Sequence, residues 1–183
     1  VKGITIADPN SEFNNKTCDV RVVEGKITAI AAQLSPEKGE TVFEGNGAIG
    51  SPGFLDLNCM IGDPGLETKE DIATGTAAAM AGGFTALAVM PNTQPVVQSK
   101  GEVAYLLNKA KDNLVNVYPI GAISHNLEGK ELAELFDMKN TGAVAFSDGN
   151  KAISDDGFMS RALQYCLGFG GLLMVYPENK AIA

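Results

Sequence analysis

The sequence predicts an α/β fold with parallel strands, preceded by a small β-rich domain, with the boundary between residues 1–49 and 50–183. From Ser51 onward, short apolar runs alternate with segments of helical periodicity, the order that builds parallel sheets with right-handed crossovers. Before that point the residues alternate at period two and no helix is indicated. Hydrophobic residues make up 45% of the 183 and charged residues 20%, which is ordinary for a folded chain.

The first 49 residues predict a small antiparallel, β-sandwich-like domain. A strand at Ile4–Ala7 runs into the turn Asp8-Pro9-Asn10, where proline and Asx side chains favour a bend. Asp19–Val23 and Lys26–Ile30 both alternate at period two, and Glu24-Gly25 between them is a hairpin signal. The alternation implies that one face of this sheet is exposed to solvent.

Five compact apolar runs in the second domain have the character of buried parallel strands. They are Phe54–Leu57, Thr85–Met90, Val117–Ile123, Ala143–Ser147 and Leu172–Tyr176. A doubly wound sheet and a (β/α)₈ barrel both fit this pattern. Because a barrel needs eight strands, we expect a barrel to be present only in part, as about five βα units.

Helical segments separate these runs. Ser99 and Glu102 form a capping box, and apolar residues follow at helical spacing: Val103, Leu106, Leu107 and Ala110. A helix over 70–81, rich in Ala, Thr and Gly, is predicted to end at Gly82-Gly83, and carboxylates begin it.

Two further helices are predicted from apolar stripes. The shorter carries Leu132, Leu135 and Phe136. The other is capped by Ser154, opens with acidic residues that complement the helix dipole, and has a longer inward face. That face consists of Phe158, Met159, Ala162, Leu163 and Cys166.

Charge and composition exclude several classes of function. The formal net charge is −8 and the sequence contains no run of Lys or Arg, which argues against a nucleic-acid partner. Apolar stretches are too short to span a membrane, and no signal peptide is recognisable at the Val1 end, which lacks a Met. The three cysteines, Cys18, Cys59 and Cys166, are odd in number and far apart, so we expect reduced, mostly buried thiols and a cytoplasmic location.

Functional groups of either architecture gather where the strands end. The predicted strand ends carry Asp56–Met60, Met90–Thr93, Ser124-His125, Phe146–Asp148 and Tyr176–Glu178. No GxGxxG or GxxxxGK[ST] motif is present, so nucleotide binding lacks support.

These segments resemble the dihydroorotases of the amidohydrolase superfamily. The similar stretches are Ser51–Leu57, Asp63-Pro64-Gly65, Gly75–Ala79, Gly82–Thr85, Met90–Thr93, Gly142–Asp148 and Met159–Tyr165. The resemblance covers nearly the whole chain and implies an amidohydrolase barrel of the TIM type. It favours dihydroorotases over hydantoinases, which carry a carboxylated lysine near the position of Ser147 and Asp148.

The resemblance also implies a divalent metal site, usually zinc, that this sequence does not reproduce. The family's His-x-His pair corresponds to Asn58 and Met60, and its bridging histidine to Tyr176. An amide oxygen and a thioether are poor substitutes for imidazole toward zinc. The arginine that binds the substrate carboxylate corresponds to Gly62. We therefore expect no metal cofactor in this copy.

Two positions match the family. Asp148 corresponds to its acidic metal ligand, and Asn92 corresponds to an asparagine that contacts substrate. Each also has a structural interpretation, which we prefer, because Asp and Asn at strand ends commonly stabilise turns. His125, the one histidine, is expected in a solvated loop. Cys59 lies between two ligand positions, so its side chain is predicted to point to the other side of the strand and to pack.

Three functional hypotheses follow from the resemblance. The first is a dihydroorotase homologue of pyrimidine biosynthesis without hydrolase activity, with an assembly role beside aspartate transcarbamoylase or in a homo-oligomer. The alternative is an active cyclic-amide hydrolase, converting dihydroorotate to carbamoyl aspartate with an altered metal site. The third is a module that binds a pyrimidine-like molecule without turnover. We also expect another segment or subunit against the strand at Leu172–Tyr176, because an open parallel edge leaves apolar faces uncovered.

Overall fold

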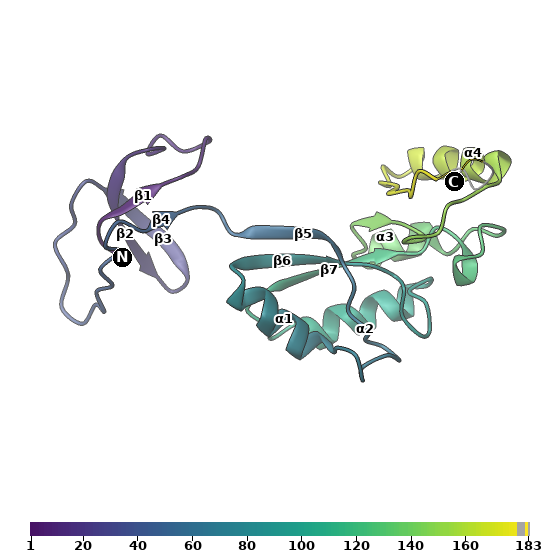
Figure 1. Ribbon diagram of the computed structural model, residues 1–183, viewed down its shortest axis with the longest axis horizontal. Coiled ribbons are helices and arrows are strands. Elements are labelled where there is room, and N and C mark those ends of the chain that lie inside the picture. The colour runs from purple at the N-terminus through teal and green to yellow at the C-terminus, as the bar shows by residue number, and fades with distance from the viewer. Residues whose placement is uncertain (179–181, 183) are drawn as a thin grey trace. The chain divides into compact units, whose positions relative to one another are not determined.

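The computed structural model describes residues 1–178 and 182, and its contacts divide the chain into two units (Figure 1). Unit 1 is Val1–Pro52 and unit 2 is Gly53–Ala183. None of the helices in the described part of the chain has the length and apolar character needed to cross a membrane.

Unit 1 is built on a four-stranded sheet with the strand order β3-β2-β1-β4. Its strands are β1 (Ile4–Ile6), β2 (Thr17–Val23), β3 (Lys26–Ala31) and β4 (Ile49–Gly50). The predicted hairpin is confirmed, with Glu24 and Gly25 both at positive φ as a tight hairpin turn requires. The antiparallel prediction is wrong for one strand, because β4 runs parallel to β1. The four strands form one sheet, so a sandwich stays a prediction.

A small core and a buried carboxylate hold unit 1 together. Ile6, Cys18 and Val20 are buried on one face of the sheet. Asp19, 7% exposed, accepts hydrogen bonds from the backbone amides of Leu34 and Gly3, and these bonds lower its pKa. A carboxylate thus fastens the segment after β3 to the sheet.

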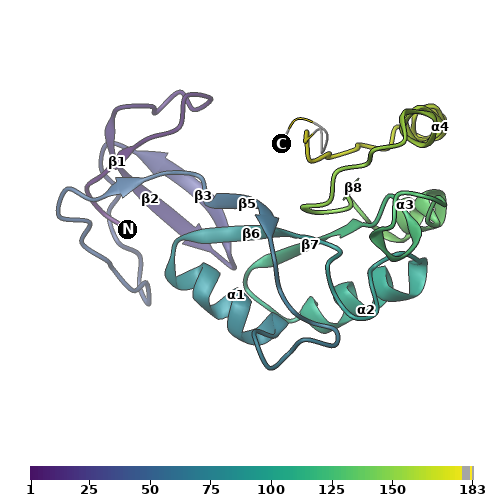
Figure 2. The ribbon, with the colours of Figure 1, turned by 45° about the vertical axis from the view of Figure 1, so that its right-hand side comes forward.

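Unit 2 is a parallel α/β unit whose sheet has the order β5-β6-β7-β8. Its strands are β5 (Phe54–Cys59), β6 (Phe84–Val89), β7 (Asn116–Gly121) and β8 (Ala145–Phe146). Its helices are α1 (Ile72–Ala81), α2 (Lys100–Ala110), α3 (Leu135–Thr141) and α4 (Asp156–Leu167), with a short 3₁₀ helix, η1 (His125–Leu127). Figure 2 shows α1 and α2 on the same face of the sheet. The predicted α/β fold with parallel strands is confirmed.

The two faces of this sheet bury different residues. On the helix side, Leu87 and Val89 of β6 join a core that includes Leu106 of α2 and Phe158 of α4. The alternating residues of β6 and β7 form a second cluster: Ala88, Met90, Ile120 and Ala145, with Met174 packed against it. Period-two alternation explains both clusters, because neighbouring side chains of a strand point to opposite faces.

The predicted fifth strand at Leu172–Tyr176 is wrong as a strand. Leu173 forms a single parallel bridge with Phe146, supported by hydrogen bonds from the Phe146 amide to Leu172 and from the Met174 amide to Phe146. The physical reason is the length of the neighbour. β8 has two residues, so it offers the segment almost no ladder to extend.

The helix predictions hold except for details at helix ends and faces. The Ser99–Glu102 capping box is present on α2. The cap of α4 is Asp155 rather than Ser154, because the Asp155 carboxylate accepts from the Phe158 amide at 2.9 Å. Two predicted inward residues, Phe136 and Leu163, are 46% and 50% exposed.

The predicted stripe of α3 is wrong for a second reason. Leu132 lies before the helix, where it forms a β-bridge with Ser124. The buried residues of α3 are Leu135 and Met138, at i and i+3. Seven residues give too few turns for an apolar stripe to locate such a helix.

Candidate functional site

The end of β5 carries two exposed side chains and one that packs inward. Asn58 is exposed, and Met60 is 62% exposed just beyond the strand. Cys59 between them packs against the helix-side core. Burial, and to a smaller extent Asp56 and Glu70, raise the pKa of the Cys59 thiol to about 11, so the sulfur is a neutral packing group at pH 7. The predicted alternation of these three side chains is therefore present.

The loop after β5 begins with a tight turn. The Leu66 amide donates to the Gly62 carbonyl at 2.6 Å, and the Lys69 amide donates to the Leu66 carbonyl at 2.9 Å. Gly62 itself is half-buried, in contact with Leu66. The position that corresponds to the family's arginine thus lies inside a closed turn.

A buried ion pair anchors the same loop to α2. Asp63 is fully buried, and Lys109 contacts its carboxylate at 2.6 Å. The Tyr105 hydroxyl donates to the other oxygen at 2.8 Å, and the Ile72 amide donates at 3.2 Å. Burial alone would raise the pKa of Asp63, but the hydrogen bonds from Lys109, Tyr105 and Ile72 outweigh it and lower that pKa. Asp63 is therefore a buried carboxylate that stays charged.

Sequence reasoning identified Asp63 within a family motif but missed its partners. Tyr105 and Lys109 are four residues apart on α2, so they share one face of that helix. An aromatic hydroxyl and an ammonium at this spacing were the available signal. The carboxylate they meet lies 42 residues from Tyr105, and no local pattern points to it.

The loop after β6 places Asn92 beside the loop after β8. The Asn92 side-chain oxygen is buried and has no hydrogen-bond partner among the described residues. Its amide lies against Gly149, at φ +68°, where no Cβ would fit. The neighbouring Gln94 amide donates to the Pro64 carbonyl at 2.9 Å, which joins this loop to the one after β5.

Asp148 joins the ends of β7 and β8. It is 3% exposed, and one carboxylate oxygen accepts from the amides of Ile123 and Ser124, each at 2.9 Å. The other oxygen accepts from the Ser124 hydroxyl. Asp148 therefore holds the neighbouring strand end rather than only its own turn, and both of its oxygens are engaged within the protein.

The two remaining predicted positions lie apart from this network. Tyr176 is 48% exposed, beyond the bridge at Leu173. His125 is half-buried at the start of η1, and its amide donates to the Glu131 carbonyl. In the part of the chain that the structure describes, no three His, Cys, Asp or Glu side chains are grouped closely enough to hold a metal ion.

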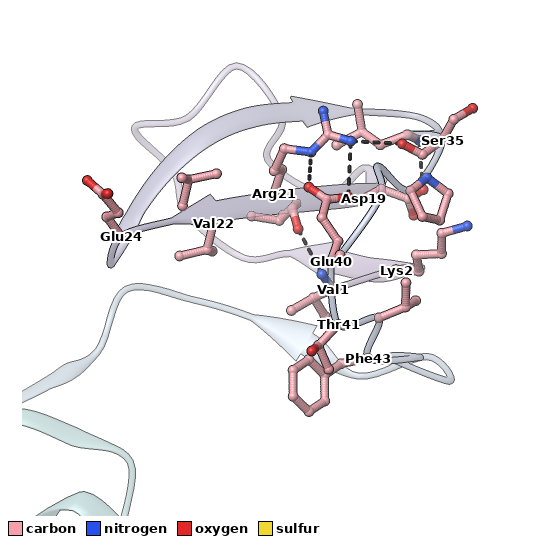
Figure 3. A pocket seen from close by; sticks show the side chains of 16 residues that line it. Val1, Lys2, Asp19, Arg21, Val22, Glu24, Ser35, Glu40, Thr41 and Phe43 are labelled. Atoms are coloured by element: carbon pink, nitrogen blue, oxygen red, sulfur yellow. Dashed lines mark hydrogen bonds and ion pairs between the residues drawn. The ribbon is translucent and has the colours of Figure 1, made fainter.

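Unit 1 has a groove of its own, of about 620 Å³, between the β2–β3 hairpin and the segment 34–43. Figure 3 shows Arg21 at its wall with hydrogen bonds to Glu40 and Ser35, and a further ion pair joins Arg21 to Glu37 at 2.8 Å. Hydrogen bonds from the Glu37 amide and from Arg21 lower the pKa of Glu40. The guanidinium is therefore fully engaged within the wall.

Comparison with known proteins identifies the class of barrel to which unit 2 belongs. The structure resembles the L-hydantoinase (dihydropyrimidinase) of Arthrobacter aurescens, with a TM-score of 0.80 at 24% identity, over 99% of this chain and 41% of that one. At this identity the likeness shows the fold alone. The curled parallel sheet is part of an amidohydrolase-type (β/α) barrel, as predicted.

Sequence relatives identify the family. The model of the dihydro-orotase-like family matches residues 47–182. The chain is 41% identical to the dihydroorotase of Citrifermentans bemidjiense over 183 residues and 42% identical to that of Acetivibrio thermocellus over 184. It covers 43% of the length of each of these relatives. This chain belongs to the dihydroorotase-like family.

The residues at the family's metal positions do not fit zinc. Catalytic zinc takes about three protein ligands, drawn from imidazole, thiolate and carboxylate. Asn58 and Met60 supply an amide and a thioether, and Tyr176 a phenol. The oxygens of Asp148 accept hydrogen bonds from Ile123 and Ser124 instead. A carboxylate that satisfies two buried amides is not free to bind a metal without releasing them.

Proposed function

We propose that this chain is the N-terminal part of a dihydroorotase-like protein of pyrimidine biosynthesis that does not hydrolyse dihydroorotate. The observation that carries this proposal is the state of Asp148. It is the strongest metal-binding group at the matched positions, and its two oxygens are engaged by Ile123 and Ser124 inside the fold. The replacements at Asn58, Met60 and Gly62 support it, because they remove the imidazole pair and the carboxylate-binding guanidinium together.

We further propose that the protein has an assembly role, with aspartate transcarbamoylase as the partner and the cytoplasm as the location. The family resemblance motivates both. The formal charge of −8 supports a partner with a basic surface, since complementary charge speeds encounter and selects partners. Size-exclusion chromatography of the protein with and without aspartate transcarbamoylase tests this role, and a protein that never co-elutes with the enzyme would contradict it.

Metal content and turnover test the loss of activity directly. The protein is purified in the presence of zinc and dialysed, its zinc is measured by plasma emission, and hydrolysis of dihydroorotate is followed. The dihydroorotase of Citrifermentans bemidjiense, treated in the same way, is the control. We expect substoichiometric zinc and no turnover for this protein. Stoichiometric zinc with turnover would refute the proposal and support the active hydrolase.

One observation favours a second candidate, a module that binds a pyrimidine-like ring without turnover. The buried Asn92 oxygen has no partner among the described residues, and a ring N–H could donate to it. A calorimetric titration with dihydroorotate separates the candidates. Heat of binding without hydrolysis supports the binding module, and the absence of heat favours the assembly role.

A further inference from the structure

We infer that the turn from Gly62 to Leu66 closes the position of the missing arginine, and that Asp63, Tyr105 and Lys109 are positioning residues that hold this turn closed. The inference rests on the proposed function, because it concerns the same position at the end of β5. It goes further in one respect. It places the loss of the substrate-carboxylate site in the backbone of a loop as well as in the identity of residue 62.

The first step is a lack of space at Gly62. A Cβ atom on this residue would lie 2.5 Å from the Leu66 carbonyl oxygen and 2.9 Å from the Leu66 Cβ. The φ of Gly62 is outside the left-handed region, so the conflict is one of space and not of backbone conformation. The opposing oxygen belongs to the backbone and cannot move aside by rotating a side chain. Every residue other than glycine, including arginine, meets this obstacle.

The second step is that the obstructing carbonyl is fixed. The Leu66 amide donates to Gly62 and the Leu66 carbonyl accepts from Lys69, so moving Leu66 breaks two hydrogen bonds. Residues on either side of the turn are also fastened. The Pro64 carbonyl accepts from the Gln94 amide. The turn is therefore held from the loop after β6.

The third step is the anchor to α2. Asp63, inside the turn, is fully buried and is bound by Lys109 at 2.6 Å and Tyr105 at 2.8 Å. A buried carboxylate cannot leave these partners without a large loss of free energy. The ion pair therefore prevents the outward movement of the turn that a side chain at position 62 would need.

A double-mutant cycle tests this assignment through thermal unfolding of the whole chain. Gly62→Ala and Gly62→Arg are each expected to lower the Tm by about 5 °C, because the Cβ atom and not the guanidinium causes the conflict. Gly101→Ala in α2 is the matched control, since a Cβ there meets only the Ser99 hydroxyl at 3.5 Å. Its Tm should stay the same or rise.

The cycle is completed with Lys109→Met. In the Gly62→Arg/Lys109→Met double variant the fall in Tm should be clearly smaller than the sum of the two single falls, because the released turn can move. Amide exchange gives an independent measurement. In Lys109→Met, the amides of Leu66 and Lys69 should exchange faster while that of Ala162 in α4 does not change.

Either of two results would overturn the inference: a Tm within 1 °C of the unaltered protein for Gly62→Ala, or additive effects in the cycle. Neither result bears on zinc content or turnover. The proposed function fails only if metal and hydrolysis are found, so the two failures are distinguishable.

Discussion

The end of β5 and the end of β8 both correspond to metal-binding positions of the family, and their side chains have opposite surroundings. Asn58 and Met60 after β5 are exposed to solvent. Asp148 after β8 is 3% exposed and satisfies the amides of Ile123 and Ser124. The residues that differ from the family pattern are those that contact little else, and the matching residue is one that the fold uses.

This difference separates the chemical from the structural duty of a strand end. A ligand side chain that projects into solvent contributes little to stability, so its replacement costs the fold almost nothing. A carboxylate that pairs with two buried amides cannot be removed without leaving them unsatisfied. A matching residue at a catalytic position therefore does not by itself indicate catalysis, and its hydrogen-bond partners have to be known.

Asp148→Ala should give the largest effect and tests the structural half of this comparison. The change leaves the amides of Ile123 and Ser124 and the Ser124 hydroxyl without their acceptor, so we expect a loss of about 3–5 kcal/mol in the free energy of unfolding. Urea denaturation measures it. Asp112→Ala, at an exposed loop residue, is the control and should stay within about 0.5 kcal/mol. Equal effects for the two variants would remove the distinction.

Lys109→Met should have an intermediate effect, because it removes the cation beside buried Asp63. We expect a loss of about 1–3 kcal/mol, at the lower end for a broken buried pair, since the Lys109 side chain is 41% exposed and solvent weakens the interaction. Urea denaturation at pH 7 measures this loss.

The pH dependence of that difference has a definite sign. The pKa of Asp63 is lowered in the folded protein, so its contribution is complete above the unfolded value of about 3.9 and is lost as the pH falls below it. The stability difference between the unaltered protein and Lys109→Met should therefore shrink below about pH 4. A difference that stays constant from pH 7 to pH 3 would show that the ion pair is not its source.

Local patterns predicted the elements of the fold where one signal had one meaning. The Ser99–Glu102 box and the Glu24-Gly25 turn each depend on neighbours within a few residues, and both are present. Leu172–Tyr176 has an equally apolar sequence but forms only a bridge. Whether an apolar run becomes a strand depends on the length of its neighbour, and the two-residue β8 is not visible in the run itself.

The candidate site was predictable in position and not in its contacts. Parallel topology places Asn58, Asn92 and Asp148 at strand ends, which apolar runs are sufficient to show. Whether Asp148 faces solvent or the amides of Ile123 and Ser124 depends on how two loops pack, about 25 residues apart. Such long-range partners follow from tertiary packing, and no spacing in the sequence encodes them.

Asn58→Ala and Met60→Ala should give the smallest effects, and they test the other half of the comparison. The hydrogen bond at Asn58 runs from its backbone amide to the Asp56 carboxylate, so truncation of the Asn58 side chain leaves it in place. Met60 is 62% exposed and has little burial to lose. Each variant should remain within about 0.5 kcal/mol of the unaltered protein in urea denaturation. A loss above about 1.5 kcal/mol at either position would place that side chain in a packed environment, and the contrast with Asp148 would then fail.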